Sequence, residues 1–380
     1  MANLNPSQKL NWIAPGLPFG NGQDGAYSSA TIPTLTKDSC SGTSGNATLT
    51  TTGSTFANGN ILLLHQTRGT NVGVWEVAKV SSGGGSTSLT LTKNKVNTYT
   101  DSGASQAQAI KIPQYTDVTV QSGTWTVPSW DGNVGGICPI AIKGDLTVTG
   151  TTTANETGYL GGSIYGATSS NHTSYQGEGT SGARNTASNS ANGTGGGGGN
   201  GGDAGRAGGG GGGHSAGGSN GQTNQGVAVG TGGGTSGSAD LITLTLGGAG
   251  GTGGSDSGDA AGGGGNGGGV IIFFVKNIVS INSITSAGGS GGVESEAGGH
   301  GGGAGGSVLI VCATATLGTN KITTAAGTGG VNSQGRNGGN GSVGRIAVHH
   351  SGTVTGTTNP SFTDVTDTSL VENAFMGGLI

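Results

Sequence analysis

The sequence predicts an all-β protein whose second half combines β-strand repeats with packed glycine-rich segments. Of its 380 residues 89 are Gly, while charged residues make up 8% and aromatic residues 4%. An ordinary globular domain is about a quarter charged, and disordered chains tend to carry a high net charge, whereas the formal net charge here is −4. Val, Ile and Thr fall in short strand-like runs, and no window shows a convincing helical period. We therefore expect an ordered, non-helical protein.

Residues 1–30 are expected to form an irregular attachment segment. Three prolines interrupt any regular element, yet Trp12 and Phe19 give the segment an apolar character that a free tail would not need. No apolar stretch follows Lys9 as it would in a secretory signal. No run in the chain approaches the roughly 18 apolar residues of a membrane span. We therefore expect Trp12 and Phe19 to serve assembly; the sequence leaves open whether the segment mounts the chain on another protein or caps its own fold. We expect no membrane insertion.

Residues 31–134 are expected to form a β-rich domain. The runs 61–69 and 74–80 are strand-like, and residues 88–94 alternate apolar and polar side chains with period two. Residues 117–130 are interpreted as a β-hairpin. This half of the chain is therefore predicted to be built from short strands.

A strand repeat is expected in the domain that we predict at residues 135–356. The blocks 267–292 and 305–330 align without a gap, so that Ile284 falls on Ile322. A third copy precedes this pair and a partial fourth copy follows it. Each copy is a glycine tract, an apolar strand, a turn, a second short strand and another glycine tract. Self-similarity at a fixed period is typical of stacked architectures in which neighbouring repeats bury each other's faces.

The glycine tracts, such as 195–214, 247–269 and 298–306, have two interpretations. They are either flexible linkers or polyproline-II-type helices (polyglycine II) packed side by side. Such a helix has no internal hydrogen bonds, so its buried amides must pair with neighbours, and only Gly lets backbones approach closely on all sides. The apolar strands that fix both ends of the tracts, and interruptions at a spacing of three residues, favour the packed form.

The last segment, residues 357–380, is expected to be a tail with an apolar end. Phe375 and Ile380 either dock against another chain or pack back onto the β core; the sequence leaves both open. The chain also has three widely spaced cysteines, which make a poor disulfide framework. They are expected to be buried free thiols: Cys40, Cys138 and Cys312.

No catalytic or metal-binding pattern rises above the background. Gly-x-Ser-x-Gly matches at 217–221 and 288–292 lack the strand–turn–helix context of a nucleophile elbow. The calcium-type pattern at 198–206 lacks its large apolar residue and occurs once. The six histidines are not spaced as zinc ligands, and at least one ring of His349 and His350 is expected to face solvent. Lys and Arg total 14 and are scattered, which argues against nucleic-acid binding. We expect no enzyme, no cofactor and no metal.

Polar and aromatic inserts between the glycine tracts are the candidates for binding. Rigid scaffolds with variable loops are where binding usually lies. Tyr offers rigid contact area with a polar tip, and the insert 163–179 contains two of them. The candidate receptor-binding residues are Tyr165, His172, Tyr175, Gln222, Asn224, Gln225, Glu294, Gln334 and Arg336.

With its alternating glycine tracts and short inserts, the region 160–345 resembles the glycine-rich adhesins at the tips of some T4-like phage tail fibres. The resemblance implies a β-rich attachment domain, a sandwich of stacked polyglycine-II helices and distal loops that bind a bacterial cell-surface receptor. It also implies a place in the virion, at the tail-fibre tip, with other tail-fibre or virion proteins as partners. A virion protein released by lysis needs no export signal, which fits the surface-type composition.

Three alternatives to an adhesin are considered. A structural glycine-rich protein of the cell surface or the extracellular space would form filaments, and a homo-oligomer is left open in either case. An ice-binding protein would need a regular array of small residues, for which the inserts are too irregular. A depolymerase would need paired carboxylates in a groove, and the clustered acids are confined to Gly-rich inserts: Asp256 with Asp259 and Glu294 with Glu296.

Overall fold

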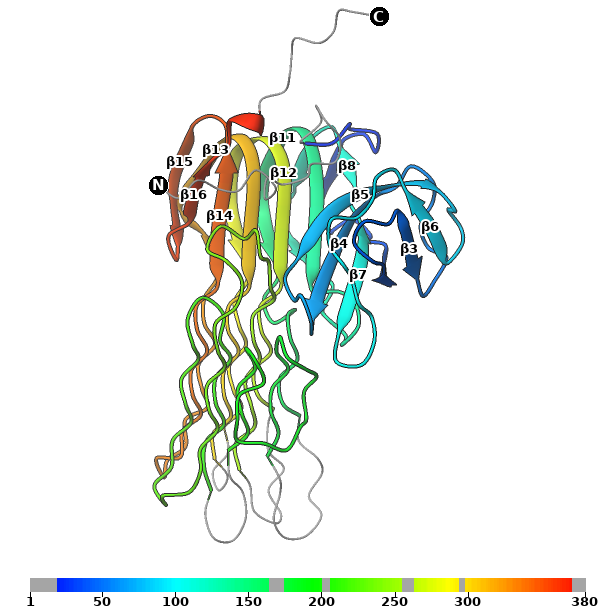
Figure 1. The fold of residues 1–380 in the computed structure, drawn as a ribbon. Coiled ribbons are helices and arrows are strands. Elements are labelled where there is room, and N and C mark those ends of the chain that lie inside the picture. The colour runs from blue at the N-terminus through cyan, green and yellow to red at the C-terminus, as the bar shows by residue number, and fades with distance from the viewer. Residues whose placement is uncertain (1–18, 164–173, 200–205, 255–262, 294–297, 371–380) are drawn as a thin grey trace, which may run out of the picture.

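The computed structural model describes residues 19–163, 174–199, 206–254, 263–293 and 298–370. It is essentially all-β, as predicted, with a closed barrel beside a parallel sheet (Figure 1). The helical element of the described residues is one 3-10 turn, η2 (Thr368–Leu370). No helix in this part of the chain is long and apolar enough to cross a membrane.

The barrel is antiparallel and closes in the order β2-β3-β6-β5-β4-β7. Its strands are β2 (Lys37–Ser41), β3 (Thr48–Thr51), β4 (Ile61–Arg68), β5 (Trp75–Ser82), β6 (Ser88–Leu91) and β7 (Gln106–Lys111). β3 and β6 alternate exposed with buried residues, as expected for strands with one solvated face. β4 is buried along its whole length because Leu62 and Leu64 fill the barrel while Ile61 and Leu63 pack toward the large sheet.

Three long strands form the centre of the parallel sheet: β11 (Ile137–Thr153), β12 (Val270–Thr285) and β13 (Ser307–Thr323). The register pairs Ile284 with Ile322, the two residues that the sequence alignment superposed. The sheet is completed by β1 (Tyr27–Ser29), β8 (Gln114–Tyr115), β9 (Val118–Val120), β10 (Thr124–Thr126), β14 (Arg345–His350), β15 (Val354–Asn359) and β16 (Thr363–Thr366). Strand pairing therefore crosses all three predicted domain boundaries, at residues 30, 134 and 356, because β1 pairs with β9, β9 pairs with β11 and β14 pairs with β16.

Each long strand has two limbs. In β11 a register shift between Ile142 and Asp145 separates them: the first limb pairs with β8, and the second pairs with β9 and β10. In β13 the first limb pairs with β14 and the second with β15. Side chains of both limbs, such as Ile140 and Leu146, lie in one core. The opposite face of the first limbs is covered by the barrel and by Leu244 and Leu246.

The predicted hairpin at 117–130 is wrong. β9 and β10 do not pair with each other; both run parallel to β11, one after the other, with Val118 opposite Leu146 and Trp125 opposite Thr152. Val118, Val120 and Trp125 are all buried in the core of the sheet. Because β9 and β10 lie one after the other along β11, all three side chains face the core. A hairpin would instead turn the second strand back against the first.

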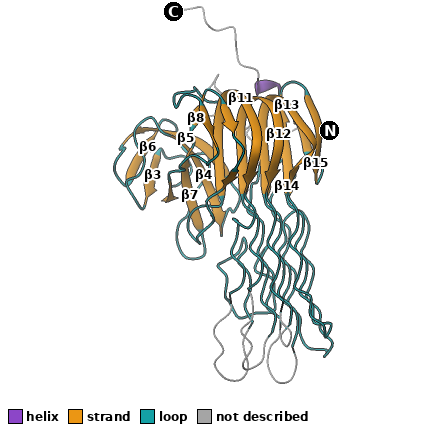
Figure 2. Ribbon diagram, turned by 180° about the vertical axis from the view of Figure 1, so that it is seen from behind, coloured by secondary structure: helices purple, strands orange, loops and turns teal. Residues whose placement is uncertain are grey.

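Extended glycine-rich segments run side by side from the ends of the long strands, away from the sheet (Figure 1). Figure 2 shows the strands gathered at one end of the molecule and these segments continuing as loops. Residues 222–229 and 331–337 connect neighbouring segments at the far end. Residues 164–173, 200–205, 255–262 and 294–297 lie outside the described residues.

The segment 206–214, here called the central tract, is hydrogen-bonded to six neighbouring segments. Its N–H groups go to three of them with a period of three residues: Gly208 and Gly211 donate to 217–222, Gly209 and Gly212 to 298–306, and Gly210 and Gly213 to 194–199. Its carbonyls accept N–H groups from three others, 230–233, 248–254 and 339–342. The segment 298–306 repeats the pattern, also with six neighbours.

The spacing of these segments leaves no room for a side chain. A Cβ added to Gly210 would lie 2.1 Å from the carbonyl oxygen of Thr231, and one added to Gly211 would lie 2.0 Å from that of Asn340. Both contacts are with backbone, which cannot rotate away as a side chain does. Gly is therefore required along the central tract by close approach on several sides.

Candidate functional site

Five of the nine predicted binding residues gather at one corner of the end remote from the sheet. The side-chain amide of Asn224 donates to the carbonyl of Gln334 (2.8 Å), and the amide of Asn337 donates to Oε1 of Gln222 (2.9 Å). The backbone N–H of Arg206 donates to Oε1 of Gln225 (2.7 Å). We call the set Arg206, 222–226 and 332–337 the distal corner.

The distal corner holds its loops by hydrogen bonds of its own. Oδ1 of Asn332 accepts the N–H of Gln334 (2.8 Å), and Oδ1 of Asn337 accepts the N–H of Asn332 (2.7 Å). Four predicted residues there are exposed to solvent: Gln222, Asn224, Gln225 and Gln334. Arg336 differs, because only 4% of it is exposed. The corner therefore presents amide groups from a hydrogen-bonded backbone, and its Arg336 is buried.

The remaining predicted residues are placed elsewhere. Tyr175 is half-buried, pairs with Ala187 and donates its N–H to Oγ1 of Thr252 (2.7 Å). Phe19 is buried within this chain, in the core that joins barrel and sheet. Six others lie outside the described residues: Tyr165, His172, Glu294, Trp12, Phe375 and Ile380.

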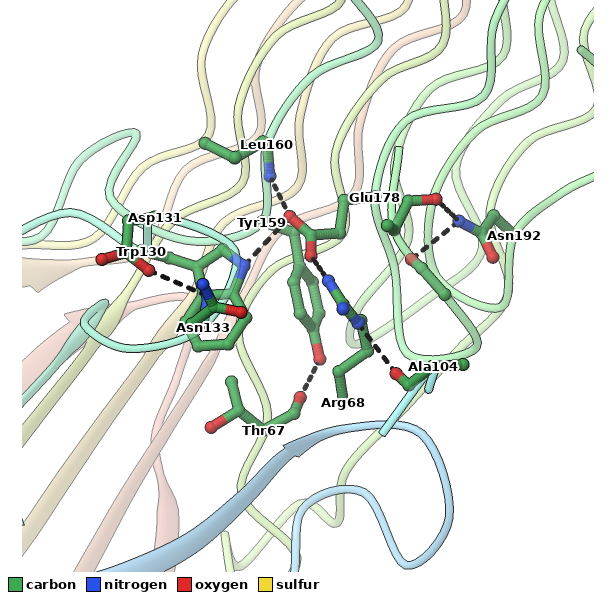
Figure 3. A network of polar contacts seen from close by, with 12 residues as sticks. Thr67, Arg68, Ala104, Trp130, Asp131, Asn133, Tyr159, Leu160, Glu178 and Asn192 are labelled. Carbon is green, nitrogen blue, oxygen red and sulfur yellow. Dashed lines mark hydrogen bonds and ion pairs between the residues drawn. The ribbon is translucent and has the colours of Figure 1, made fainter. Parts of the chain in front are cut away.

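A buried ion pair, which the sequence reading missed, joins the barrel to the glycine-rich segments (Figure 3). Arg68, at the end of β4, pairs with Glu178, and their side chains are 6% and 1% exposed. The other oxygen of Glu178 accepts the indole N–H of Trp130 (3.0 Å) and the backbone N–H of Leu160 (3.1 Å). Arg68 also donates through Nε to the carbonyl of Ala104 (3.0 Å). Both charges are thus compensated by several partners, as buried ions require.

Further polar contacts fix the barrel beside the ion pair. Nε2 of His65 lies 2.8 Å from the carbonyl oxygen of Leu244, and Nδ1 lies 2.9 Å from Oγ1 of Thr67. The indole N–H of Trp75 donates to the carbonyl of Leu241 (3.2 Å). His65 and Arg68 both come from the strand-like run 61–69, in which sequence reasoning recognised only a strand. The signal that could have found them is the presence of polar groups at the end of a fully apolar run.

The expectation that one ring of His349 or His350 faces solvent is wrong. The two residues are 2% and 9% exposed. Nε2 of His349 lies 2.7 Å from the carbonyl oxygen of Asp240, which covers one face of β14. Nε2 of His350 lies 2.5 Å from Oδ1 of Asp364 in β16. Neighbouring chain segments, which a local pattern does not reveal, cover both sides of this strand.

Buried histidines predict that the protein loses stability in acid. Burial lowers the pKa of His65 to about 4, that of His300 to about 4 and that of His214 to about 3, where Arg345 also contributes. Unfolding restores a pKa of about 6.5, so the unfolded chain binds more protons below that pH. The free energy of unfolding is therefore unaffected by these groups above pH 6.5 and decreases as the pH falls from 6.5 toward 4. At pH 5 the expected loss is about 2 kcal/mol for each histidine.

Urea denaturation between pH 7.5 and 4.5 measures this dependence. A His65→Gln variant keeps a donor and an acceptor but does not titrate in this range, so its slope against pH should be shallower than that of the natural sequence. A free energy of unfolding that stays constant from pH 7 to pH 5 would contradict the prediction.

Metal-binding and thiol chemistry find no support in the described residues. No three His, Cys, Asp or Glu side chains gather there as they would around a metal ion. The three cysteines are free and buried, as predicted. Burial raises the pKa of Cys138 and of Cys312 to about 12 and also raises that of Cys40, so the reactive thiolate is disfavoured.

Comparison with protein-family models, with curated proteins and with solved structures gave no match to this chain. The function of the chain is therefore inferred from the geometry of its distal end and of the segments that carry it.

Proposed function

We propose that this chain is a receptor-binding adhesin at the tip of a phage tail fibre. It recognises a bacterial surface protein or glycan through the connections between its glycine tracts. The observation that carries the proposal is the convergence of Gln222, Asn224, Gln225 and Gln334 on one exposed corner, at the end remote from the sheet. Those residues come from inserts separated by more than a hundred positions, and hydrogen bonds between the inserts hold them together.

In this proposal the glycine-rich segments form a sandwich of polyglycine-II helices, which extends from the ends of the repeated strands. The three-residue period with which the central tract 206–214 bonds to its neighbours supports this, because a polyproline-II helix has three residues per turn. The crowding around its glycines supports it as well, since each direction of the helix meets another backbone.

The mechanism is geometric and involves no chemical step. A body cross-linked by backbone hydrogen bonds in six directions holds the distal amides in place before the receptor arrives. Less conformational entropy is then lost on binding, which favours affinity. Side-chain amides offer both a donor and an acceptor, so they suit the hydroxyl and amide groups of glycans and of protein loops. Several fibres on one virion add avidity.

Binding of the labelled protein to a panel of bacterial strains tests the proposal. We expect strain-selective binding, weakened at least about tenfold when Asn224 and Gln334 are both changed to Ala, since each lost polar contact costs about 1 kcal/mol or more. Asn94→Ala, at an exposed site of the barrel, is the matched control and should bind normally. Absence of binding to every strain, or equal loss in the control, would refute the proposal.

A further inference from the structure

Within the described residues, no other segment covers the outer face of the second limbs of the long strands. Parallel sheets are normally covered on both faces, and the first limbs follow this rule. In the second limbs the inward residues are buried in the core, whereas outward residues such as Thr149, Asn282 and Thr319 are exposed. The same side continues into the glycine-rich segments 287–293 and 325–331, where every third residue is turned outward.

The outward residues form ranks across neighbouring segments. Thr153, Thr285, Thr323 and Asn359 lie opposite one another in register, and a hydrogen bond of 2.9 Å links the hydroxyls of Thr153 and Thr285. Below them Ser290 and Thr328 are linked in the same way, at 3.0 Å. We call this surface the ranked face; its outward residues are Thr147, Ser280, Thr316, Thr355, Thr149, Asn282, Thr319, Thr357, Thr153, Thr285, Thr323, Asn359, Ala287, Ala325, Ser290, Thr328, Val293 and Val331.

The two most exposed large hydrophobic residues of the described part lie on the ranked face. They are Val293 and Val331, which are 63% and 68% exposed. The charged side chains beside this face are few and of both signs. They are Lys321 between the ranks of β13, Asp145 in register with Asn277 and Thr314, and Glu156, whose carboxylate lies against Gly289. A surface of hydroxyls and methyl groups with these few charges does not select a strongly charged partner.

We propose that the ranked face pairs with the same face of a second copy of this chain. From the rise and spacing of strands and extended segments, its area is on the order of 700 Å², close to the roughly 800 Å² that each partner buries in a standard interface. A two-fold contact uses the same patch on both copies, and a face of equivalent ranks is complementary to itself. Pairing would bury Val293 and Val331 and would cover the open face of the sheet.

The pairing does not depend on the receptor, and it has a consequence for binding. With the two-fold axis along the glycine-rich segments, both distal corners would point the same way, so that one dimer presents two receptor sites. Two linked sites strengthen attachment without any new contact.

Sedimentation of the full chain across the micromolar range tests the proposal. We expect a dimer for the natural sequence and at least about tenfold weaker association for Thr316→Arg and for Val331→Asp, each of which places charge in the interface. Thr87→Arg and Val96→Asp make the same changes at exposed sites of the barrel and should leave the dimer unchanged. Melting curves check that all four variants fold.

A chain that stays monomeric throughout that range would overturn the proposal, and so would a dimer that both ranked-face variants leave intact. Adsorption of the monomer to glycan or to ice through this face would likewise replace it with a different function. Because cell binding by the distal corner needs only one copy, failure of the dimer leaves the adhesin proposal standing. Loss of cell binding in turn leaves the dimer standing.

Discussion

Gly218→Ala is expected to destabilise the protein by about 3 kcal/mol, the upper end of the usual range for overpacking. A Cβ at this position would lie 2.2 Å from the carbonyl oxygen of Gly211 and 2.6 Å from that of Gly212. Both belong to the central tract, which is bonded on six sides and cannot move away. The segment that carries the new methyl group must shift instead, which breaks the 2.9 Å bond from Gly218 to Gly233. Urea denaturation measures the change.

The adjacent residue is a matched control in the same segment. A Cβ at Gly217 has one neighbour within 4 Å, the carbonyl oxygen of Gly233 at 3.5 Å, and the φ angle of Gly217 is one that other residues adopt. Ala there restricts the unfolded chain without a clash, so Gly217→Ala should be neutral or stabilising by up to about 1 kcal/mol. Equal effects at the two positions would mean that close backbone approach does not hold these segments together.

The fold class was predictable because it depends on local patterns. The low charge, the Val, Ile and Thr runs and the absence of a helical period all point to strands, and the described residues are essentially all-β. Pairing partners were not predictable from local patterns alone. β9 and β10 have the spacing of a hairpin, yet each pairs with β11. Partner choice follows from which arrangement buries Val118, Val120 and Trp125, and this depends on strands distant in sequence.

In the candidate site too, the residue types were predictable from the local sequence, whereas their contacts were not. Asn224 and Gln334 were identifiable as polar residues that interrupt glycine tracts, but their contact spans 110 positions, and nothing local indicates it. Arg336 was chosen on the same basis and is buried. His65, Arg68 and Glu178 were missed because a single charged or polar residue in a strand or an insert looks like a surface residue. Only the docking of the barrel reveals that they are interior.

Glu178→Gln is expected to destabilise the protein by about 3–5 kcal/mol, the usual effect of removing one partner from a buried ion pair. The substitution keeps the shape of the side chain and an oxygen for the N–H groups of Trp130 and Leu160, but it leaves the guanidinium of Arg68 buried without a counter-charge. Denaturant titration measures the loss. Glu156→Gln, at an exposed site, should change stability by less than about 0.5 kcal/mol.

A double variant separates the charge from the other contacts of this joint. Arg68→Met combined with Glu178→Gln removes both charges at similar volume, and replacing both members of a buried pair is often neutral. We therefore expect the double variant to recover most of the stability that Glu178→Gln loses, despite the lost bond from Arg68 to Ala104. If the double variant is instead as unstable as the sum of the two single variants, hydrogen bonding rather than charge compensation holds the barrel against the glycine-rich segments. Limited proteolysis at residues 30–36 and 112–113, which link the barrel to β1 and β8 of the parallel sheet, then reports whether the barrel has detached while the sheet stays folded.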